Sequence, residues 1–509
     1  MSVFPPSRAT RPYGVAPALA LLLAGCLPSR YVARHAPPPG ELAREAARAT
    51  SAPAVSAAVR PEPSDGARGT LRTEAEVAAP GPGAPPHSLA DLVDLALSRD
   101  PATRATWHET RAAAAQAGSR RTAYLPSLDA SGNATRQRPA GGQGRAVATT
   151  NTAGASANLT WLLIDLGARG ALVDEADRLL AAARLAEHAA VADLLLRVQE
   201  TYFGYLAARA LVEAQTAATA QAAASLAAAE GRQRSGLATI ADVLQARTAL
   251  SQTRLGLQQL EGQAFTFRGA LATLAGLPPT AGLEVGALPA QVDAASALPA
   301  VDDLLTAAAA QNPDVARARA TADAADARAR AASRALLPTL SLQAGASRSY
   351  LLDSSDPLME PAWGSTGWNV GLVLRLPLLD GLGLRPAYDA LAARASADAA
   401  YARADATSQR VALDVWTSFQ GLRTAGQRIG TSKDLLDSAR ASTEVARGRY
   451  KEGVGSILDL LNAQAALEQA RAEDVRARSD FLVALARLAR AAGRLDLPER
   501  PPESQEGTP

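Results

Sequence analysis

The stretch GRYKEGVGSILDLLNAQAAL, residues 448–467, has a counterpart in GRQRSGLATIADVLQARTAL, residues 231–250. Identical positions include Gly231, Arg232, Gly236, Ile240, Asp242, Leu244, Ala246 and Leu250, which recur as Gly448, Arg449, Gly453, Ile457, Asp459, Leu461, Ala463 and Leu467. Gly236 and Gly453 each follow a helical pattern, and glycine tolerates the left-handed backbone that commonly ends a helix. Each copy therefore predicts a helix that ends, reverses and returns as a second helix.

The duplication covers a much longer unit than this turn. Pro101 matches Pro313, which sets the offset at 212 residues, and Pro126 matches Pro338 at the same offset. Solenoid repeats have periods of about 20–50 residues, so this spacing indicates duplication of a whole multi-element unit. We expect a first repeat over residues 88–280, a second over 300–495, and a disordered tail over 496–509.

The hydrophobic period changes within each repeat. Residues 88–123 are predicted to form a helix, with Ser88 as its N-cap and Pro126 beyond its end. Four segments then alternate small or apolar residues with polar ones, which is the pattern of membrane β-strands. These predicted strands are 127–137, 155–164, 340–349 and 368–376.

A very long helical run follows each pair of strands. Residues 170–234 contain no proline, and residues 384–451 contain only Pro386, near the start. At 1.5 Å per residue each run reaches roughly 100 Å. A shorter helix is predicted to return from each turn, to about residue 275 or 492.

Four strands are too few to close a membrane barrel. The smallest barrels of this kind have about eight strands, and an open sheet edge is not tolerated in lipid. The chain must therefore share its strands with copies of itself. Three copies in a closed cyclic assembly, a homotrimer, would supply twelve strands.

The N-terminal residues have the pattern of a bacterial lipoprotein signal. Arg8 and Arg11 precede a short apolar stretch that ends in Leu23-Ala24-Gly25-Cys26, which resembles a lipobox. The resemblance implies a signal peptide over 1–25, cleavage before Cys26, and diacylglyceryl and N-acyl lipid on this single cysteine. Leu27 is not an inner-membrane retention aspartate, which favours delivery to the outer membrane. An ordinary secretory signal with an incidental cysteine is the alternative.

The segment after the predicted cleavage site differs in composition from the rest of the chain. Residues 26–87 are rich in proline and alanine, with HAPPPG and APGPGAPP. Such a segment cannot bury enough apolar surface to offset its chain entropy, so we interpret it as a tether.

Composition and motifs argue against catalysis and against nucleic-acid binding. The formal net charge is +2 for 509 residues, which is near neutral. The four histidines, His35, His87, His108 and His188, have no ligand spacing. The chain has no Walker loop, no G-x-S-x-G elbow and no H-E-x-x-H pattern. We expect no enzyme activity, no metal site and no cofactor other than the lipid on Cys26.

Residues 85–495 resemble the outer membrane efflux protein family, the TolC-like outer membrane factors. The resemblance rests on the duplicated halves, the strand exit PLLDGLG, the turn RYKEGVGSILDLLNAQ and the lipobox, which is typical of the acylated NodT/OprM-type branch. It implies an α+β membrane protein, a trimeric 12-stranded outer-membrane β-barrel with four strands per chain, continued by a long periplasmic α-helical barrel. The implied partners are outer-membrane lipids, a periplasmic adaptor (membrane fusion) protein and an inner-membrane pump.

The resemblance also assigns a channel constriction to the repeated turn. Asp459 and Tyr450 match family residues that close the periplasmic end, Asn462 stands where a second aspartate is expected, and Asp242 is the equivalent of Asp459 in the first hairpin. Three copies of Asp459 would form a carboxylate ring that favours cations. The alternative is that both aspartates only cap helices, with Thr239 and Ser456 as N-caps.

The turns themselves resemble the surface that meets an adaptor. We call residues 235–239 and 452–456 the rim, and its docking residues are Gly236, Leu237, Thr239, Gly453, Val454 and Ser456. A solvated loop without a partner is the alternative. The implied function is a passive conduit for small toxic compounds from a pump–adaptor complex to the exterior. Two other functions stay open: a conduit for type I protein secretion, and a periplasmic coiled-coil scaffold lipoprotein without a pore.

Overall fold

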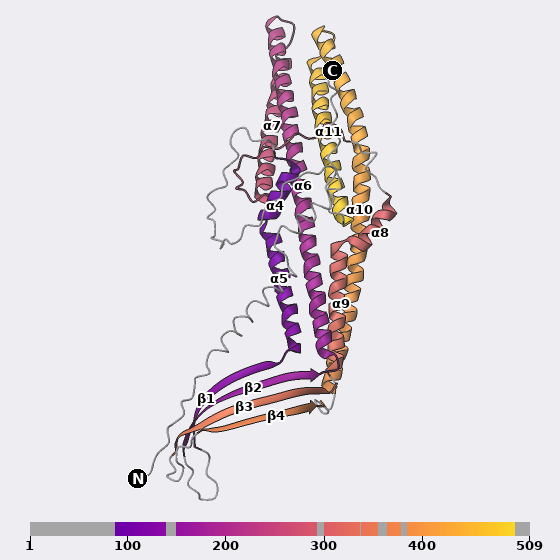
Figure 1. Ribbon diagram of the computed structural model, residues 1–509. Helices are drawn as coiled ribbons and strands as arrows, with labels where there is room; N and C mark the ends of the chain where they lie inside the picture. Colours follow the sequence, from indigo (N-terminus) through magenta and orange to yellow (C-terminus); the bar gives the residue numbers. More distant parts are fainter. Residues whose placement is uncertain are drawn as a thin grey trace, which may run out of the picture. The chain divides into compact units, whose positions relative to one another are not determined.

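The computed structural model describes residues 87–138, 149–292, 300–335, 337–354, 364–377 and 384–493 (Figure 1). The elements follow the chain in the order α4 (Leu89–Arg99), α5 (Pro101–Arg121), η1 (Thr122–Tyr124), β1 (Ser127–Gln137), β2 (Thr150–Ile164), α6 (Ala168–Arg234), α7 (Ile240–Leu274), α8 (Val301–Gln311), α9 (Pro313–Arg334), β3 (Thr339–Ser354), β4 (Ser365–Arg375), α10 (Leu384–Lys451) and α11 (Ile457–Ala491). Across these ranges, no helix is both long and apolar enough to cross a membrane.

The chain divides into two compact units. Among the described residues, the first unit comprises 108–184 and 317–405, and it contains the sheet. The second comprises 87–107, 185–316 and 406–493. The helices α5, α6, α9 and α10 contribute residues to both units.

The sheet has four antiparallel strands in the order β1-β2-β3-β4. Residues paired directly across antiparallel strands project from the same face. The register places polar or small residues on one face, which we call the polar face: Ser127, Asp129, Ser131, Asn133, Thr160, Asn158, Ser156, Gly154, Gln343, Gly345, Ser347, Ser349, Gly371, Asn369, Gly367 and Ser365. Direct contacts confirm it, since the hydroxyls of Ser131 and Ser156 lie 2.9 Å apart.

The opposite face of the sheet is mostly apolar, although one of its rows contains Arg348 and Thr366. Its cross-strand rows join Leu128, Leu159, Ala344 and Val370, and then Ala130, Ala157, Ala346 and Trp368. Trp368 is 80% exposed and Leu128 is 70% exposed in the single chain. In the described part of the sheet, β1 and β4 each pair with one strand only, so both outer edges are open.

A buried arginine joins the sheet to α6 within the first unit. The guanidinium of Arg169 donates to the carbonyl oxygens of Leu162 at 2.6 Å and Ala123 at 3.2 Å, and it lies 3.2 Å from the Asp165 carboxylate. Burial alone would raise the pKa of Asp165, but the backbone and side-chain hydrogen bonds from Arg169 hold it below its ordinary value. The charged pair thereby satisfies carbonyls at the end of β2, where sheet pairing stops.

Two apolar clusters form the core of the second unit. One packs α4 against α6 and α7, with Leu92, Leu194 and Leu271 fully buried. The other packs α8 against α10 and α11, with Leu422 and Phe481 at its centre. Each such side chain contributes about 1.5–3 kcal/mol when fully buried.

The sequence predictions agree with the helices and strands except at some boundaries. The single helix predicted over 88–123 is wrong, because α4 ends at Arg99 and α5 begins at Pro101. Asp100 is extended (φ −62°, ψ 123°), as expected for a residue before proline, and its carboxylate caps α5 by accepting from Thr103 N at 2.8 Å. Ser88 is the N-cap of α4, as predicted, with a capping box to Asp91.

The strand boundaries differ as well. The strand β2 begins at Thr150 rather than 155, and β3 extends to Ser354 rather than 349. The added residues pair with each other across the sheet, since Thr150 lies opposite Ser354. The four predicted strands are all present as strands.

Candidate functional site

The two turns of the second unit have the same backbone geometry. Gly236 and Gly453 have φ values of 72° and 78°, in the left-handed region where glycine is favoured. At the first turn, Leu237 N donates to Arg232 O at 2.8 Å and Gly236 N donates to Gln233 O at 3.0 Å. Val454 N donates to Arg449 O at 3.0 Å in the equivalent bond of the second turn. This is the Schellman pattern that ends a helix.

We call α6 with α7 the first hairpin and α10 with α11 the second hairpin. A capping box starts the returning helix in both. The Thr239 hydroxyl accepts from Asp242 N, and the Asp242 carboxylate accepts from Thr239 N at 2.7 Å. Ser456 and Asp459 make the same pair at the start of α11, where the bond from Ser456 N to the carboxylate is longer, at 3.4 Å. Both aspartates therefore act as helix caps. This capping does not conflict with a role in a constriction, because Asp459 is also exposed.

The predicted constriction residues lie near the ends of both hairpins. Tyr450 lies in the last turn of α10 and Asn462 is exposed on α11, one turn beyond Asp459. Burial raises the pKa of the Tyr450 hydroxyl; Arg232 opposes this shift and Asp242 adds to it. The structure thus brings Tyr450 close to residues of the first hairpin, whereas Asp459 and Asn462 lie on a solvent-exposed surface of the single chain.

Arg232 of α6 connects the first hairpin to Tyr450 of the second. Its guanidinium carbon lies 4.9 Å from the centre of the Tyr450 ring, and its Nη1 donates to the Tyr450 carbonyl oxygen at 2.9 Å. The Tyr450 hydroxyl is buried and has no hydrogen-bond partner among the described residues. The contact between the hairpins at this point therefore depends on the ring and the backbone of Tyr450.

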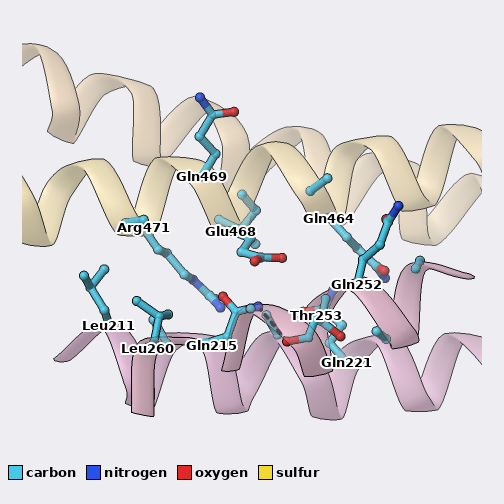
Figure 2. A pocket seen from close by; sticks show the side chains of 18 of the residues that line it. Leu211, Gln215, Gln221, Gln252, Thr253, Leu260, Gln464, Glu468, Gln469 and Arg471 are labelled. Carbon is cyan, nitrogen blue, oxygen red and sulfur yellow. Dashed lines mark hydrogen bonds between the residues drawn. The ribbon is translucent and has the colours of Figure 1, made fainter. Parts of the chain in front are cut away.

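A cavity of about 760 Å³ lies between α6, α7 and α11, and many of its lining side chains are amides (Figure 2). Those labelled in Figure 2 are Gln215, Gln221, Gln252, Gln464 and Gln469. Gln464 Nε2 donates to the hydroxyl of Ser225 at 3.0 Å, which links α11 to α6. Near the tips the two hairpins therefore contact each other through a few polar bridges as well as apolar side chains.

The rim is exposed in the single chain. Leu237 is 70% exposed and Val454 is 69% exposed, and the first residue of α7, Ile240, is 61% exposed. A Cβ added to Gly236 would meet no atom within 4 Å. The two turns therefore present apolar side chains on an unobstructed surface.

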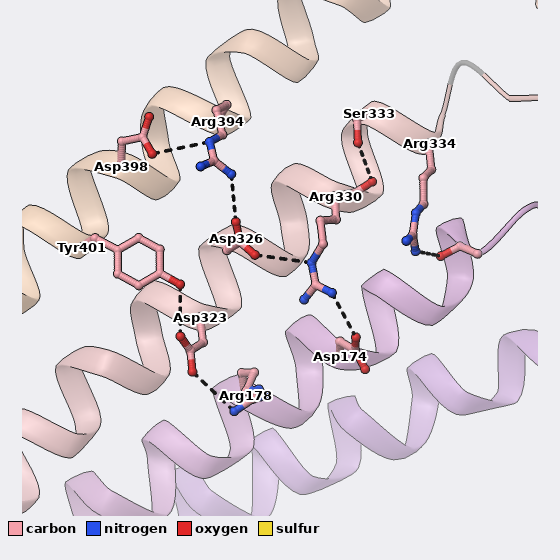
Figure 3. A network of polar contacts seen from close by, with 11 residues as sticks. Asp174, Arg178, Asp323, Asp326, Arg330, Ser333, Arg334, Arg394, Asp398 and Tyr401 are labelled. Carbon is pink, nitrogen blue, oxygen red and sulfur yellow. Dashed lines mark hydrogen bonds and ion pairs between the residues drawn. The ribbon is translucent and has the colours of Figure 1, made fainter.

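A network of charged residues connects three helices of the first unit (Figure 3). Asp323 of α9 accepts from Arg178 of α6 at 3.3 Å and from the Tyr401 hydroxyl of α10 at 3.1 Å. Asp326 of α9 accepts from Arg394 of α10 at 3.1 Å. Exposed pairs contribute about 0–1 kcal/mol each, so this network orients the helices more than it stabilises them.

Sequence reasoning did not identify the partner of Tyr450 or the bond between Ser225 and Gln464. Arg232 belongs to the repeated Gly-Arg pair, and Arg449 is its counterpart, but only the first of the two arginines stacks on a tyrosine. The repeated Gly-Arg pair indicated that both arginines lie near a turn, but it did not show which of them contacts Tyr450. In the described ranges, no cluster of histidine, cysteine and acidic side chains could hold a metal ion. Cys26 lies outside the described residues.

Comparison with known proteins gives a consistent result. The family model for "Outer membrane efflux protein" matches residues 92–277 and 304–494. "Protein CyaE" of Bordetella pertussis is 30% identical over 411 residues, covering 80% of this chain and 84% of that protein. The "Pyoverdine export outer membrane protein OpmQ" of Pseudomonas putida is 27% identical over 424 residues, covering 80% and 85%. The solved outer-membrane channel OprN has a similar fold, with a TM-score of 0.71 at 22% identity, covering 80% of this chain and 89% of that chain.

Proposed function

Because the chain belongs to the outer membrane efflux protein family, we propose that it is the outer-membrane channel of a tripartite efflux system. In this role it is a passive conduit that carries small toxic compounds from a periplasmic adaptor and an inner-membrane pump to the exterior. The family is one of efflux proteins, not enzymes, so the chain performs no catalysis of its own. The energy for transport comes from the pump.

The observation that carries the proposal is the sheet with one polar and one apolar face and two open edges. A membrane barrel needs an apolar outer surface and no free edge. Four strands cannot close, but three copies that join β1 to β4 give twelve strands in a ring. The apolar rows then face lipid and the polar face lines the pore.

The hairpins supply the periplasmic part of the proposed conduit. In a trimer of two-hairpin chains, six similar turns would form one ring. The exposed Leu237 and Val454 support docking of an adaptor at this rim. Three copies of Asp459, with Asn462 beside them, would line a cation-favouring constriction that Tyr450 and Arg232 help to hold.

Lipid on Cys26 would anchor the chain to the outer membrane in addition to the barrel. The proposal rests on the lipobox in the sequence, and residues 26–87 would act as the tether to the first repeat. Two membrane attachments are stronger than one acyl group alone.

The name of the relative OpmQ reports pyoverdine export, which supports small compounds as the cargo. We therefore place small compounds ahead of proteins as cargo. A protein-secretion conduit makes a different prediction, since its loss would retain a secreted protein in the cell and leave tolerance to small toxic compounds unchanged.

Deletion of the gene tests the proposal. The deletion strain should become more sensitive to a subset of drugs, dyes or metal ions, and the wild-type gene should restore tolerance. Gly453→Glu should fail to restore it although the protein reaches the membrane, because a charged side chain then occupies the rim and a left-handed position. The matched control is Gly448→Glu, within α10, where a Cβ meets no atom within 4 Å. Unchanged tolerance in the deletion strain across the whole screen would refute small-molecule efflux.

A further inference from the structure

One cross-strand row of the sheet joins all four strands. Asp129 of β1 pairs with Asn158 of β2, which pairs with Gly345 of β3, and Gly345 pairs with Asn369 of β4. Directly paired residues share a face. The row therefore places one carboxylate and two amides side by side on the polar face.

Gly345 leaves the space that the two amides occupy. A Cβ at this position would lie 2.6 Å from Oδ1 of Asn369 and 3.2 Å from Oδ1 of Asn158. Both asparagine side chains thus lean over the β3 backbone from either side. A similar arrangement occurs at Gly154, where a Cβ would lie 2.8 Å from Oδ1 of Asn133. Glycines in the sheet therefore give room to polar side chains on this face.

Asp129 is nearly alone as a charge on the polar face. Among the strand residues of the regular ladder (127–137, 152–162, 339–351 and 365–375), the other ionisable side chain there is Arg375, the last residue of β4. Arg375 lies six positions from Asn369 along the strand, which corresponds to roughly 20 Å. Arg348 of β3 projects from the opposite face, because it lies between Ser347 and Ser349. The neutral amides and hydroxyls near Asp129 leave its negative charge uncompensated.

We propose that Asp129, with Asn158 and Asn369 beside it, determines the ionic preference of the membrane-spanning pore. This inference rests on the proposed function, because a pore exists only if the strands of several copies close into a barrel. Three copies of the row would form a belt of carboxylates and amides around the lumen. The belt attracts cations and disfavours anions, and it is separate from the rim at Asp459.

The expected effect is modest because the pore is wide. A strand spacing of about 4.8 Å and a tilt of about 40° give a twelve-stranded barrel a backbone radius of roughly 12 Å. Three unit charges about 10 Å from the axis in water, screened over about 10 Å at 0.1 M salt, shift the cation-to-anion permeability ratio by about two- to fivefold. At 1 M salt the screening length is about 3 Å, so the preference should disappear.

Single-channel recording of the full chain in planar bilayers tests this. The reversal potential in a KCl gradient gives the permeability ratio for the wild type and for Asp129→Asn, which removes the charge and keeps the shape. Arg348→Gln is the matched control, since it changes one charge on the apolar face. Both variants are also recorded in an Asp459→Asn background, so that the rim carboxylates do not contribute.

Thiol modification provides a second measurement on channels that have already assembled. The native chain has one cysteine, Cys26. In an Asp129→Cys variant, a sulfonate reagent should restore the cation preference and a trimethylammonium reagent should reverse it. Ala130→Cys, on the apolar face, should not react with either water-soluble reagent.

The outcomes separate this inference from the conduit itself. A two- to fivefold loss of cation preference in Asp129→Asn at 0.1 M salt, with no change in Arg348→Gln, supports it. If the channels conduct but their cation-to-anion permeability ratio changes neither in Asp129→Asn nor on modification of Asp129→Cys, this inference is refuted and the proposed conduit is not. Reaction at Ala130→Cys instead of Asp129→Cys would also overturn it. Absence of any wild-type channel would refute the proposed conduit, and this inference with it.

Discussion

Replacing Arg232 by alanine is expected to loosen the end of the second hairpin, because this residue makes two contacts with Tyr450. The guanidinium carbon lies 4.9 Å from the ring centre, and Nη1 donates to the carbonyl oxygen at 2.9 Å. The hydroxyl of Tyr450 makes no hydrogen bond among the described groups. The cation–π contact should therefore survive Tyr450→Phe and be lost in Tyr450→Leu, whereas the bond to the main-chain carbonyl is present in both variants.

The size of the effect follows from the two contacts. A cation–π contact contributes about 0.5–2 kcal/mol, and a hydrogen bond from a charged donor contributes about 1–2 kcal/mol where it is partly exposed. Together they amount to about 1.5–4 kcal/mol, which is about a 10- to 900-fold change in the equilibrium for local opening. Tyr450→Phe should be neutral or slightly stabilising, because a buried hydroxyl without a partner carries a desolvation cost.

Hydrogen exchange of the full-length protein in detergent measures this local opening. Amides in residues 448–456 should exchange about 10-fold faster or more in Arg232→Ala, which loses both contacts. They should exchange about 2- to 30-fold faster in Tyr450→Leu, which loses only the cation–π contact. The double variant should add little to Arg232→Ala, because that substitution already removes both contacts with Tyr450. Arg449→Ala is the matched control, since it is the repeat counterpart of Arg232 and is exposed.

Two results would refute this reasoning. One is faster exchange in Tyr450→Phe equal to that in Arg232→Ala, which would mean that the hydroxyl carries the contact. The other is an equal effect of Arg449→Ala, which would mean that any positive charge near the tip has the same effect.

Three further predictions test other parts of the structure. Gly236→Ala should destabilise its turn by about 1–2 kcal/mol because of the left-handed backbone (φ 72°), whereas Gly231→Ala within α6 should stabilise the helix by about 0.5–1 kcal/mol. Amide hydrogen exchange near each site should become faster in the first variant and slower in the second, and a change in the same direction in both would contradict this. Arg169→Ala should destabilise the protein by about 3–5 kcal/mol and lower its melting temperature. Arg330→Ala, in an exposed network, should change stability by less than about 1 kcal/mol. Similar melting temperatures in the two variants would show that the bonds from Arg169 to the end of β2 contribute little to stability. Cys26→Ser should abolish incorporation of radiolabelled palmitate, and continued labelling would show that another residue is acylated.

The helices and strands could largely be predicted because their patterns are strong. Long stretches nearly free of proline predicted α6 and α10 to within a few residues at each end. Alternation of apolar and polar residues predicted all four strands, and the repeated glycines predicted both left-handed turns. These features depend on local backbone preference and on the period of the side chains, which one sequence contains.

The remaining features depend on contacts between distant segments. The helix break at Asp100 was missed because the preceding and following residues keep a helical period, although Pro101 was the available signal. The start of β2 was missed because Thr150 and its neighbours do not alternate, and they are placed by pairing with β3. Arg232 could not be distinguished from Arg449, because only the packing of α6 against α10 brings one of them over a tyrosine ring.

The central claim is that one chain supplies a third of a shared barrel, and the mass of the extracted particle tests it most directly. Native mass spectrometry of the full-length protein, released from detergent, should give a single species of three copies. Release of a stable monomer as the only species, from a sample whose circular dichroism still shows the folded state, would contradict the claim.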